Sequence, residues 1–268
     1  MSASNSPSRL VSELEPLLQV NQVAKYYGER IGCEDISFTL WPGEVLGIVG
    51  ESGSGKSTLL RCLAGLDTPS HGEVLFRHHN KMVDIFSLPE ATRRAMMRTE
   101  WGIVHQNPRD GLRMDVSAGG NVGERLMDRG DRHFGAIRTS ASDWLSRVEI
   151  DKSRIDDRPR QFSGGMQQRL QIARVLVSEP RLVFMDEPTG GLDVSVQARL
   201  LDLLRVLVRD LGIAAVIVTH DLAVARLLTD RLMVMKDGHV VEQGLTDQVL
   251  DDPHHAYTQL LASAVLAA

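Results

Sequence analysis

A glycine-rich run that contains a single lysine is the clearest chemical feature of the chain. It reads Gly50-Glu51-Ser52-Gly53-Ser54-Gly55-Lys56-Ser57-Thr58, after the apolar segment 45–49 and before the helix-like segment 59–64. The glycines allow turns that a side chain would block, so successive N–H groups can surround a phosphate at a helix N-terminus. Lys56 would reach the β- and γ-phosphates, and the Ser57 hydroxyl would ligate Mg²⁺. The run therefore predicts a P-loop that binds a nucleoside triphosphate, and it leaves kinase, GTPase and motor functions open.

Two adjacent carboxylates, Asp186 and Glu187, follow the apolar segment 182–185. A buried parallel strand ends in this way when it delivers acids to a site. We expect Asp186 to hold Mg²⁺, directly or through water, and Glu187 to accept a proton from an attacking water or to orient it. The alternative is a helix N-terminus, where acids before Pro188 are favourable. A P-loop needs an acid that holds magnesium, which favours the strand interpretation.

Three further polar sites lie at predicted element ends. Gln106 follows the short apolar segment 102–104, where it would face a bound metal or water, although by itself it is an ordinary loop residue. His220 follows the apolar run 213–218 and would hydrogen-bond the γ-phosphate or the attacking water, although a single histidine at a strand end is most often structural. Ser163-Gly164-Gly165 opens a helix, which predicts either a second phosphate-binding helix N-terminus or an ordinary serine N-cap.

Hydrophobic periodicity predicts the elements that position these residues. Residues 1–16 are rich in Ser, Asn and Pro and are predicted to be a disordered tail. Residues 107–177 have no strong strand signal and are predicted to form a separate helical lobe. Strands are expected within 17–40 and at 72–76, 102–104, 182–185, 213–218 and 231–241, and helices at 59–64, 88–98, 116–129, 134–148, 163–177, 194–210, 246–250 and 257–265.

Composition limits the function classes. With 268 residues, 43% of them hydrophobic, the chain can bury a substantial core, and a formal charge of -5 with a pI near 6.0 argues against nucleic acid as the main partner. Cys33 and Cys62 are far apart, which indicates two reduced thiols in a cytoplasmic protein. The longest apolar stretches are too short or too interrupted to span a bilayer, so any membrane role is expected to go through a partner.

Taken in order, six motifs resemble those of the ATP-binding cassette (ABC) ATPase family: the P-loop, Gln106, Ser163-Gly164-Gly165, Asp186-Glu187, Asp193 and His220. The resemblance covers nearly the whole chain. It implies an α/β P-loop NTPase cassette with a mainly parallel sheet core, an N-terminal antiparallel β part and an inserted helical lobe. The ATPase domain would span 17–268, with the ATP-binding core formed by 17–106 and 178–268 and the lobe by 107–177.

The resemblance also implies ATP and Mg²⁺ as cofactors and assigns roles to residues. Tyr27 would stack on adenine, with Tyr26 as the alternative. Without the family resemblance, the sequence favours interpreting Tyr27 as a half-buried strand tyrosine. Ser57, Gln106 and Asp186 would hold the metal. Lys56, Glu187 and His220 would act in hydrolysis.

In the ABC family two cassettes associate head to tail, so that each ATP lies between the P-loop of one and the signature helix of the other. The chain would then contribute half of each site, as a homodimer or with a paralogous subunit. Tyr27, residues 50–58, Gln106, Asp186, Glu187 and His220 would form one half. Ser163, Gly164, Gly165 and the loop of Asp193 would complete the site of the partner.

Finer resemblances suggest the partner system. Met166 in the signature and the tail 252–258 are similar to the oligopeptide, dipeptide and nickel importer branch. Segments 98–102, 110–113, 116–127 and 190–199 resemble the ATPase subunits of bacterial carbon-phosphorus lyase systems, which degrade phosphonates. Three functions follow: an ATPase that drives a soluble carbon-phosphorus lyase complex, the energising subunit of an importer, or a non-hydrolysing ATP-gated clamp. The 116–127 stretch is interpreted either as a close-packing partner surface or as internal packing of the lobe.

Overall fold

The computed structural model describes residues 15–266, so the predicted tail lies outside the described residues except for Glu15 and Pro16. Secondary-structure elements follow one another in the order β1 (Leu18–Tyr27), β2 (Arg30–Leu40), β3 (Val45–Val49), α1 (Lys56–Leu63), β4 (His71–His78), β5 (Lys81–Asp84), α2 (Glu90–Thr99), β6 (Trp101–Val104), α3 (Pro108–Gly111), α4 (Ala118–Asp128), α5 (Phe134–Arg147), the 3₁₀ turns η2 (Lys152–Arg154) and η3 (Pro159–Gln161), α6 (Gly164–Leu176), β7 (Leu182–Asp186), α7 (Val194–Leu211), β8 (Ala214–Thr219), α8 (Leu222–Leu228), β9 (Arg231–Lys236), β10 (His239–Leu245), α9 (Thr246–Asp251) and α10 (Ala256–Leu266).

The larger sheet is mainly parallel and has the strand order β10-β9-β3-β8-β7-β6. Strand β3 pairs in parallel with β8 and β9, and β7 pairs in parallel with β8 and β6; β10 closes the edge as an antiparallel hairpin with β9. The strands β3 and β8 are apolar and buried along their whole length because helices or strands cover both faces. The predicted parallel core is confirmed.

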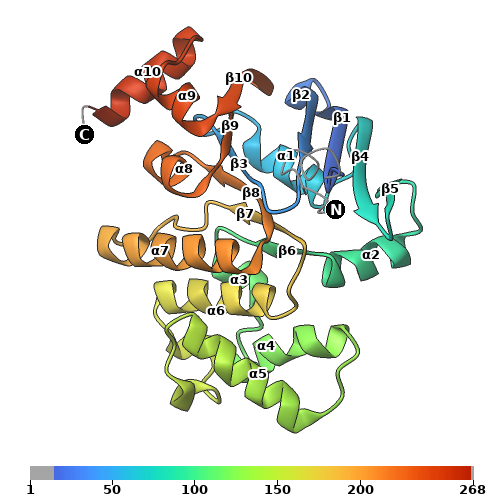
Figure 1. Cartoon of the computed structure of the whole chain (residues 1–268), viewed down its shortest axis with the longest axis vertical. Helices are drawn as coiled ribbons and strands as arrows, with labels where there is room; N and C mark the ends of the chain where they lie inside the picture. Colours follow the sequence, from blue (N-terminus) through green and yellow to red (C-terminus); the bar gives the residue numbers. More distant parts are fainter. Residues whose placement is uncertain (1–14, 267–268) are drawn as a thin grey trace, which may run out of the picture.

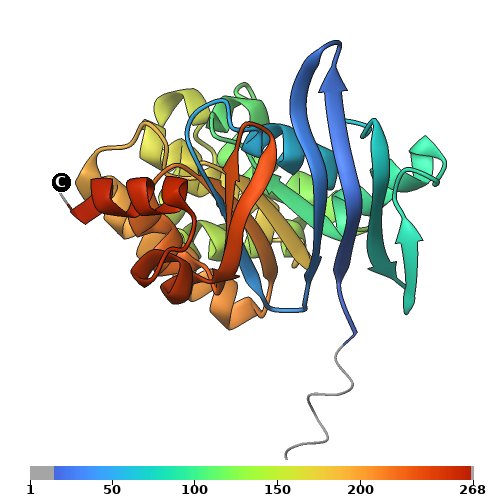
Figure 2. The ribbon, with the colours of Figure 1, turned by 90° about the horizontal axis from the view of Figure 1, so that it is seen from above.

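The smaller sheet is antiparallel, in the order β2-β1-β4-β5. Its apolar face and helix α1 share one core with the larger sheet, in which Ile36, Leu59 and Phe184 are fully buried. The free thiols of Cys33 and Cys62 lie in the same core. Figure 2 shows β1, β2 and β4 on one side of the molecule and helix α10 on the other. The predicted N-terminal antiparallel part is confirmed.

Helices cover the opposite face of the larger sheet in two layers. In Figure 1, α7 and α6 lie next to the sheet and α4 and α5 lie beyond α6. Trp144, Leu145 and Leu170 of the helices pack into one core with Met185 and Ile217 of the sheet. Residues 107–177 form helices and no strand, and we propose that they make up the predicted lobe.

The stretch 116–127 packs mainly inside this lobe. Ala118, Asn121 and Val122 are fully buried, and the Asn121 amide donates to the carbonyl oxygens of Arg113, Val116 and Ser117 at 3.0–3.1 Å. Asn121 thus fixes the loop that enters α4 and satisfies its backbone. Internal packing, the second of the two interpretations, describes this stretch.

Within residues 15–266, none of the helices combines the length and the apolar character needed to cross a membrane.

Candidate functional site

The carboxyl ends of β3, β7 and β8 meet at one edge of the larger sheet, and a cavity opens there. The parallel register sets Val49 beside Thr219 and Asp186 beside Val218, so the loops that begin at Gly50, Glu187 and His220 start at the same level. The cavity has a volume of about 900 Å³, a size that suits a small-molecule cofactor. Its lining includes the predicted residues Tyr27, Gly50, Glu51, Ser52, Gly53, Gly55, Lys56, Ser57, Thr58, Gln106, Glu187 and His220.

The P-loop wraps around the ammonium group of Lys56, which is 5% exposed. Lys56 Nζ donates to the carbonyl oxygen of Gly50 at 2.8 Å and to that of Glu51 at 2.7 Å, and more weakly to Ser54 Oγ at 3.4 Å. Burial lowers the pKa of Lys56, and the nearby carboxylates oppose that shift. Lys56 thus lines the cavity while its ammonium group is hydrogen-bonded to its own loop.

Two glycines of the loop are required by close packing. Gly50 has φ of 148°, and a Cβ there would lie 2.2 Å from the carbonyl oxygen of Met235. Gly55, at the start of α1, has φ of 100°, and a Cβ would lie 2.1 Å from the carbonyl oxygen of Gly32. Any side chain at either position would therefore displace the loop.

Oxygen donors suited to magnesium lie beside the loop. Ser57 Oγ donates to Asp186 Oδ1 at 3.1 Å. Burial raises the pKa of Asp186, and the Ser57 hydrogen bond opposes this shift. In the described part of the chain no group of three or more His, Cys, Asp or Glu side chains is arranged to hold a metal. A hydroxyl and one carboxylate nevertheless fit Mg²⁺, which completes its shell with water and substrate phosphates.

Glu187 lies between two side chains that come from neighbouring strand ends. Gln106 Nε2, after β6, donates to Glu187 Oε2 at 2.8 Å, and His220 Nδ1, after β8, lies 3.0 Å from Glu187 Oε1. Glu187 has φ of 42°, a left-handed conformation that costs energy for a residue with a side chain and is typical of functional sites. Its N–H donates to the carbonyl oxygen of Val218 at 2.8 Å, which holds this turn in place.

Of the two candidate tyrosines, Tyr27 lines the cavity. Its ring is 48% exposed, and Lys25 Nζ lies 5.4 Å from the ring centroid. The Tyr26 hydroxyl instead donates to Glu34 at 2.6 Å, and Tyr26 is not part of the lining. An exposed aromatic face at the rim can stack on a flat base.

The signature residues lie apart from this cavity. Ser163, Gly164, Gly165 and Asp193 are fully described, and none of them is part of its lining. Ser163 is exposed and caps α6, where its Oγ accepts the N–H of Met166 at 3.3 Å. Asp193 is exposed at the start of α7, where its side chain makes no capping hydrogen bond. Within one chain, Ser163 is an ordinary N-cap.

Four residues of the lining were not predicted. Arg30, Ile31 and Gly32 belong to the start of β2, and Leu261 belongs to α10. No motif in the sequence marked these four residues, because only the tertiary fold brings β2 and α10 to the cavity.

Comparison with known proteins decides the family. Residues 33–190, more than half of the chain, match the family described as ABC transporter. The chain belongs to the ABC ATPase family. Among solved structures, this ABC ATPase is similar to the dimeric post-hydrolysis state of the ATP-binding cassette MJ0796 bound to ADP and Pi. The TM-score is 0.76 and the identity 31%, and the match covers 86% of this chain and 99% of that one. It is also similar to cbiO1 of Clostridium perfringens, part of an ABC transporter complex, with a TM-score of 0.77, 32% identity and coverage of 89% and 92%.

Two curated relatives bear on the partner system. The ABC ATPase is 65% identical over 252 residues to a protein of Escherichia coli (strain K12) that carries the provisional name of phosphonates utilization ATP-binding protein PhnK; the match covers 94% of this chain and 98% of that protein. It is 36% identical over 260 residues to the dipeptide transport ATP-binding protein DppF of the same strain, with coverage of 93% and 76%. The family and its ADP-bound structural neighbour establish that this ABC ATPase binds and hydrolyses ATP.

Proposed function

We propose that this ABC ATPase is a cytoplasmic subunit that drives conformational work in a carbon-phosphorus lyase complex during phosphonate breakdown. The observation that carries the proposal is the 65% identity with PhnK over nearly the full length of both chains, against 36% with DppF. The ATPase would not itself cleave the carbon-phosphorus bond, because its reactive groups are those of phosphate binding and water activation.

In the proposed mechanism, nucleotide binding uses the cavity at the strand ends. Tyr27 stacks on adenine, and the N–H groups of residues 50–58 surround the phosphates. Lys56 exchanges its loop carbonyls for phosphate oxygens. Ser57, Asp186 and the Gln106 amide oxygen would hold Mg²⁺, which neutralises phosphate charge when bound.

Glu187 is proposed as the residue that activates water. Its carboxylate is the acceptor for a water proton, and Gln106 and His220 each contact one of its two oxygens, which fixes the orientation of the carboxylate. His220 is 64% exposed at its side chain, so it can turn from Glu187 toward a γ-phosphate.

A second cassette is proposed to complete each site. Ser163 and Asp193 are exposed, and the buried Gly165 lies in the first turn of α6. All three lie outside the chain's own cavity, so we expect this surface to face the nucleotide of a partner. The N-terminus of α6 would then stabilise γ-phosphate charge. Dimeric MJ0796 structures support a second cassette as partner, which is either a copy of this chain or a paralogue.

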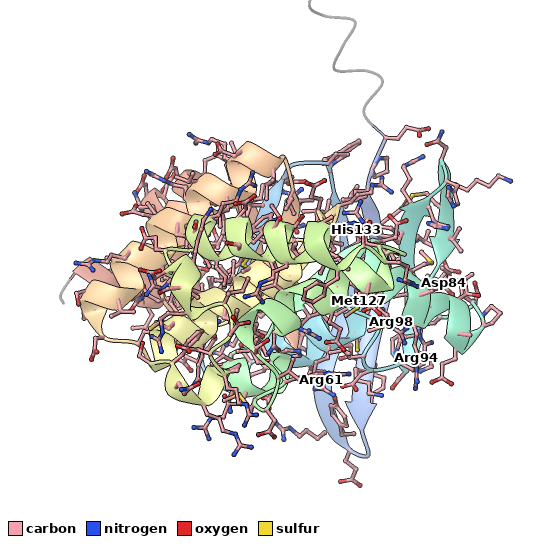
Figure 3. All side chains as sticks on the ribbon, turned by 90° about the horizontal axis from the view of Figure 1, so that it is seen from below. Arg61, Asp84, Arg94, Arg98, Met127 and His133 are labelled. Carbon is pink, nitrogen blue, oxygen red and sulfur yellow. The ribbon has the colours of Figure 1, made fainter. Side chains whose placement is uncertain are left out.

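The lyase-facing surface is proposed at the groove between α2 and the helical lobe. A cavity of about 260 Å³ there is lined by Arg94, Arg98, Arg125 and Arg174, with Asp110 as the acid among them. Figure 3 shows Arg94 and Arg98 of α2 on the same face as Met127 and His133 of the lobe. Arg94 pairs with Glu90 and Arg174 with Glu124, so Arg98 and Arg125 are the guanidinium groups that favour carboxylates of a partner. The exposed Asp110 offers the same partner a carboxylate for a basic group.

The importer alternative rests on the DppF match and predicts a permease as partner. The clamp alternative predicts binding without turnover, and the presence of Glu187 and His220 argues against it.

Complementation separates these functions. An E. coli K12 strain without its PhnK protein should regain growth on a phosphonate as sole phosphorus source when it produces this chain. The Lys56→Ala variant should not restore growth. If the wild-type chain is produced and hydrolyses ATP but growth does not return, while a strain without DppF regains dipeptide uptake, the importer function is the better one.

A further inference from the structure

The C-terminal helix α10 contacts the P-loop directly. The N–H of Glu51, the second residue of the loop, donates to the phenol oxygen of Tyr257 at 2.9 Å. Tyr257 is 6% exposed and packs among Val49, Val234 and other buried residues beneath the loop. Leu261, one helical turn later, lines the nucleotide cavity. One face of α10 therefore forms part of the wall behind the phosphates.

The position of the phenol is fixed from the edge of the larger sheet. The Glu242 carboxylate on β10 accepts the N–H groups of His254 at 2.8 Å and His255 at 3.0 Å. His255 Nδ1 in turn accepts the N–H of Tyr257 at 3.1 Å, and Lys236 Nζ lies 5.1 Å from the centroid of the Tyr257 ring. These contacts give the tail motif noted in the sequence a physical role.

Glu51 is held on both sides of its backbone. Tyr257 binds its N–H, and Lys56 Nζ binds its carbonyl oxygen at 2.7 Å. When Lys56 turns to a phosphate, it gives up that carbonyl, and the Tyr257 bond remains. Burial raises the pKa of Tyr257, so the phenol is neutral at pH 7 and stays an acceptor without charge.

We propose that Tyr257 is a positioning residue that keeps the first turn of the P-loop in its phosphate-binding conformation. It acts through Glu51 and touches neither the reacting atoms nor the γ-phosphate. Tyr257 therefore sets nucleotide affinity through preorganisation and leaves the chemical step unchanged.

The test is Tyr257→Phe in the full chain, which removes one oxygen and keeps the ring. Loss of one backbone hydrogen bond predicts roughly a two- to tenfold rise in the KM for ATP and in the Kd for both ATP and ADP, with unchanged kcat. The matched control is Gln259→Ala in the same helix, which removes the hydrogen bond to the carbonyl of Pro253, just before the helix, and leaves the loop contact in place. This control should keep wild-type KM and kcat.

Hydrogen exchange gives a second readout that does not depend on turnover. In Tyr257→Phe the amide hydrogens of residues 50–52 should exchange faster, while those of β7 keep their wild-type rates. Wild-type KM and wild-type exchange at residues 50–52 in Tyr257→Phe would overturn the proposal. A fall in Tm or kcat with unchanged KM would also overturn it, because the phenol would then act on stability or chemistry instead of loop position.

Discussion

Glu187 is the residue that we propose to be needed for ATP hydrolysis and not for ATP binding. Glu187→Gln keeps the length of the side chain and one acceptor oxygen but removes the carboxylate that would accept a proton. We expect ATP affinity close to wild type and turnover lower by about 10²–10⁴-fold. Equilibrium nucleotide binding and phosphate release measure the two quantities. Turnover at the wild-type rate in Glu187→Gln would mean that another group activates water.

Lys56→Ala is the contrasting variant for the same pair of measurements. It removes the cation that we expect at the β- and γ-phosphates, so affinity and turnover should fall together. If Lys56→Ala still binds ATP tightly, Lys56 does not contact the phosphates and the predicted phosphate site is wrong.

The charged Asp186 carboxylate is proposed to hold Mg²⁺, but its burial lowers the stability of the nucleotide-free fold. Burial raises the pKa of its carboxyl in the folded state, so charging it near neutral pH costs folding free energy. Asp186→Asn keeps an acceptor for Ser57 and should raise the Tm of the nucleotide-free protein at pH 7. The gain should shrink as the pH falls toward 3.8, the ordinary value for this group, because the wild-type carboxyl then becomes neutral. Thermal unfolding at pH 5 and pH 7, with and without MgATP, tests this; a gain that grows on acidification would contradict it.

At the residue scale, the sequence identified those site residues whose position in a motif or after a strand is set by their chemistry. The P-loop, the two acids, Gln106 and His220 could be identified because each follows an apolar strand, and the structure gathers most of them around one cavity. Arg30, Ile31 and Leu261 could not be placed there from the sequence, because only tertiary folding brings β2 and α10 to that edge. The roles of the site residues stay predictions.

At the element scale, the start of α6 is the feature on which the proposed ATP-driven dimerisation would depend. Ser163→Arg puts bulk and positive charge at an exposed helix N-terminus, where charge of that sign is also unfavourable. We expect it to abolish the ATP-dependent dimer that Glu187→Gln should accumulate, because unhydrolysed nucleotide bridges the two half-sites.

Sedimentation of the Glu187→Gln protein, with and without Ser163→Arg, measures this effect. Thr139→Arg adds the same side chain at an exposed position on α5 and serves as the control. An unchanged dimer in the Ser163→Arg protein would count against head-to-tail association.

Long amphipathic helices and strands with a continuous apolar run were predicted well, and three short elements were missed. Helix α7 was expected at 194–210 and spans Val194–Leu211, and β8 was expected at 213–218 and spans Ala214–Thr219. Strand β5 and helix α3 have four residues each and lack a continuous apolar run, and α8 has seven residues, too few to show helical periodicity; all three were missed.

At the scale of the whole molecule, the partner surface can be separated from the nucleotide site. Asp110 and Arg113 are exposed where the lobe begins, and neither lines the nucleotide cavity. Asp110→Ala with Arg113→Ala should weaken binding to the lyase complex and leave ATP affinity unchanged. Arg226 is exposed on α8, and Arg226→Ala is the control: it should keep wild-type binding to the lyase complex and wild-type ATP affinity. Equal loss of ATP affinity in the double variant would show that the lobe, rather than a partner contact, had been damaged.

Co-purification tests the account most directly. The wild-type chain, tagged and isolated without detergent from cells growing on a phosphonate, should recover the subunits of the carbon-phosphorus lyase complex, and the Asp110→Ala, Arg113→Ala protein should recover less of it. Recovery of a membrane permease and no lyase subunits would contradict the account.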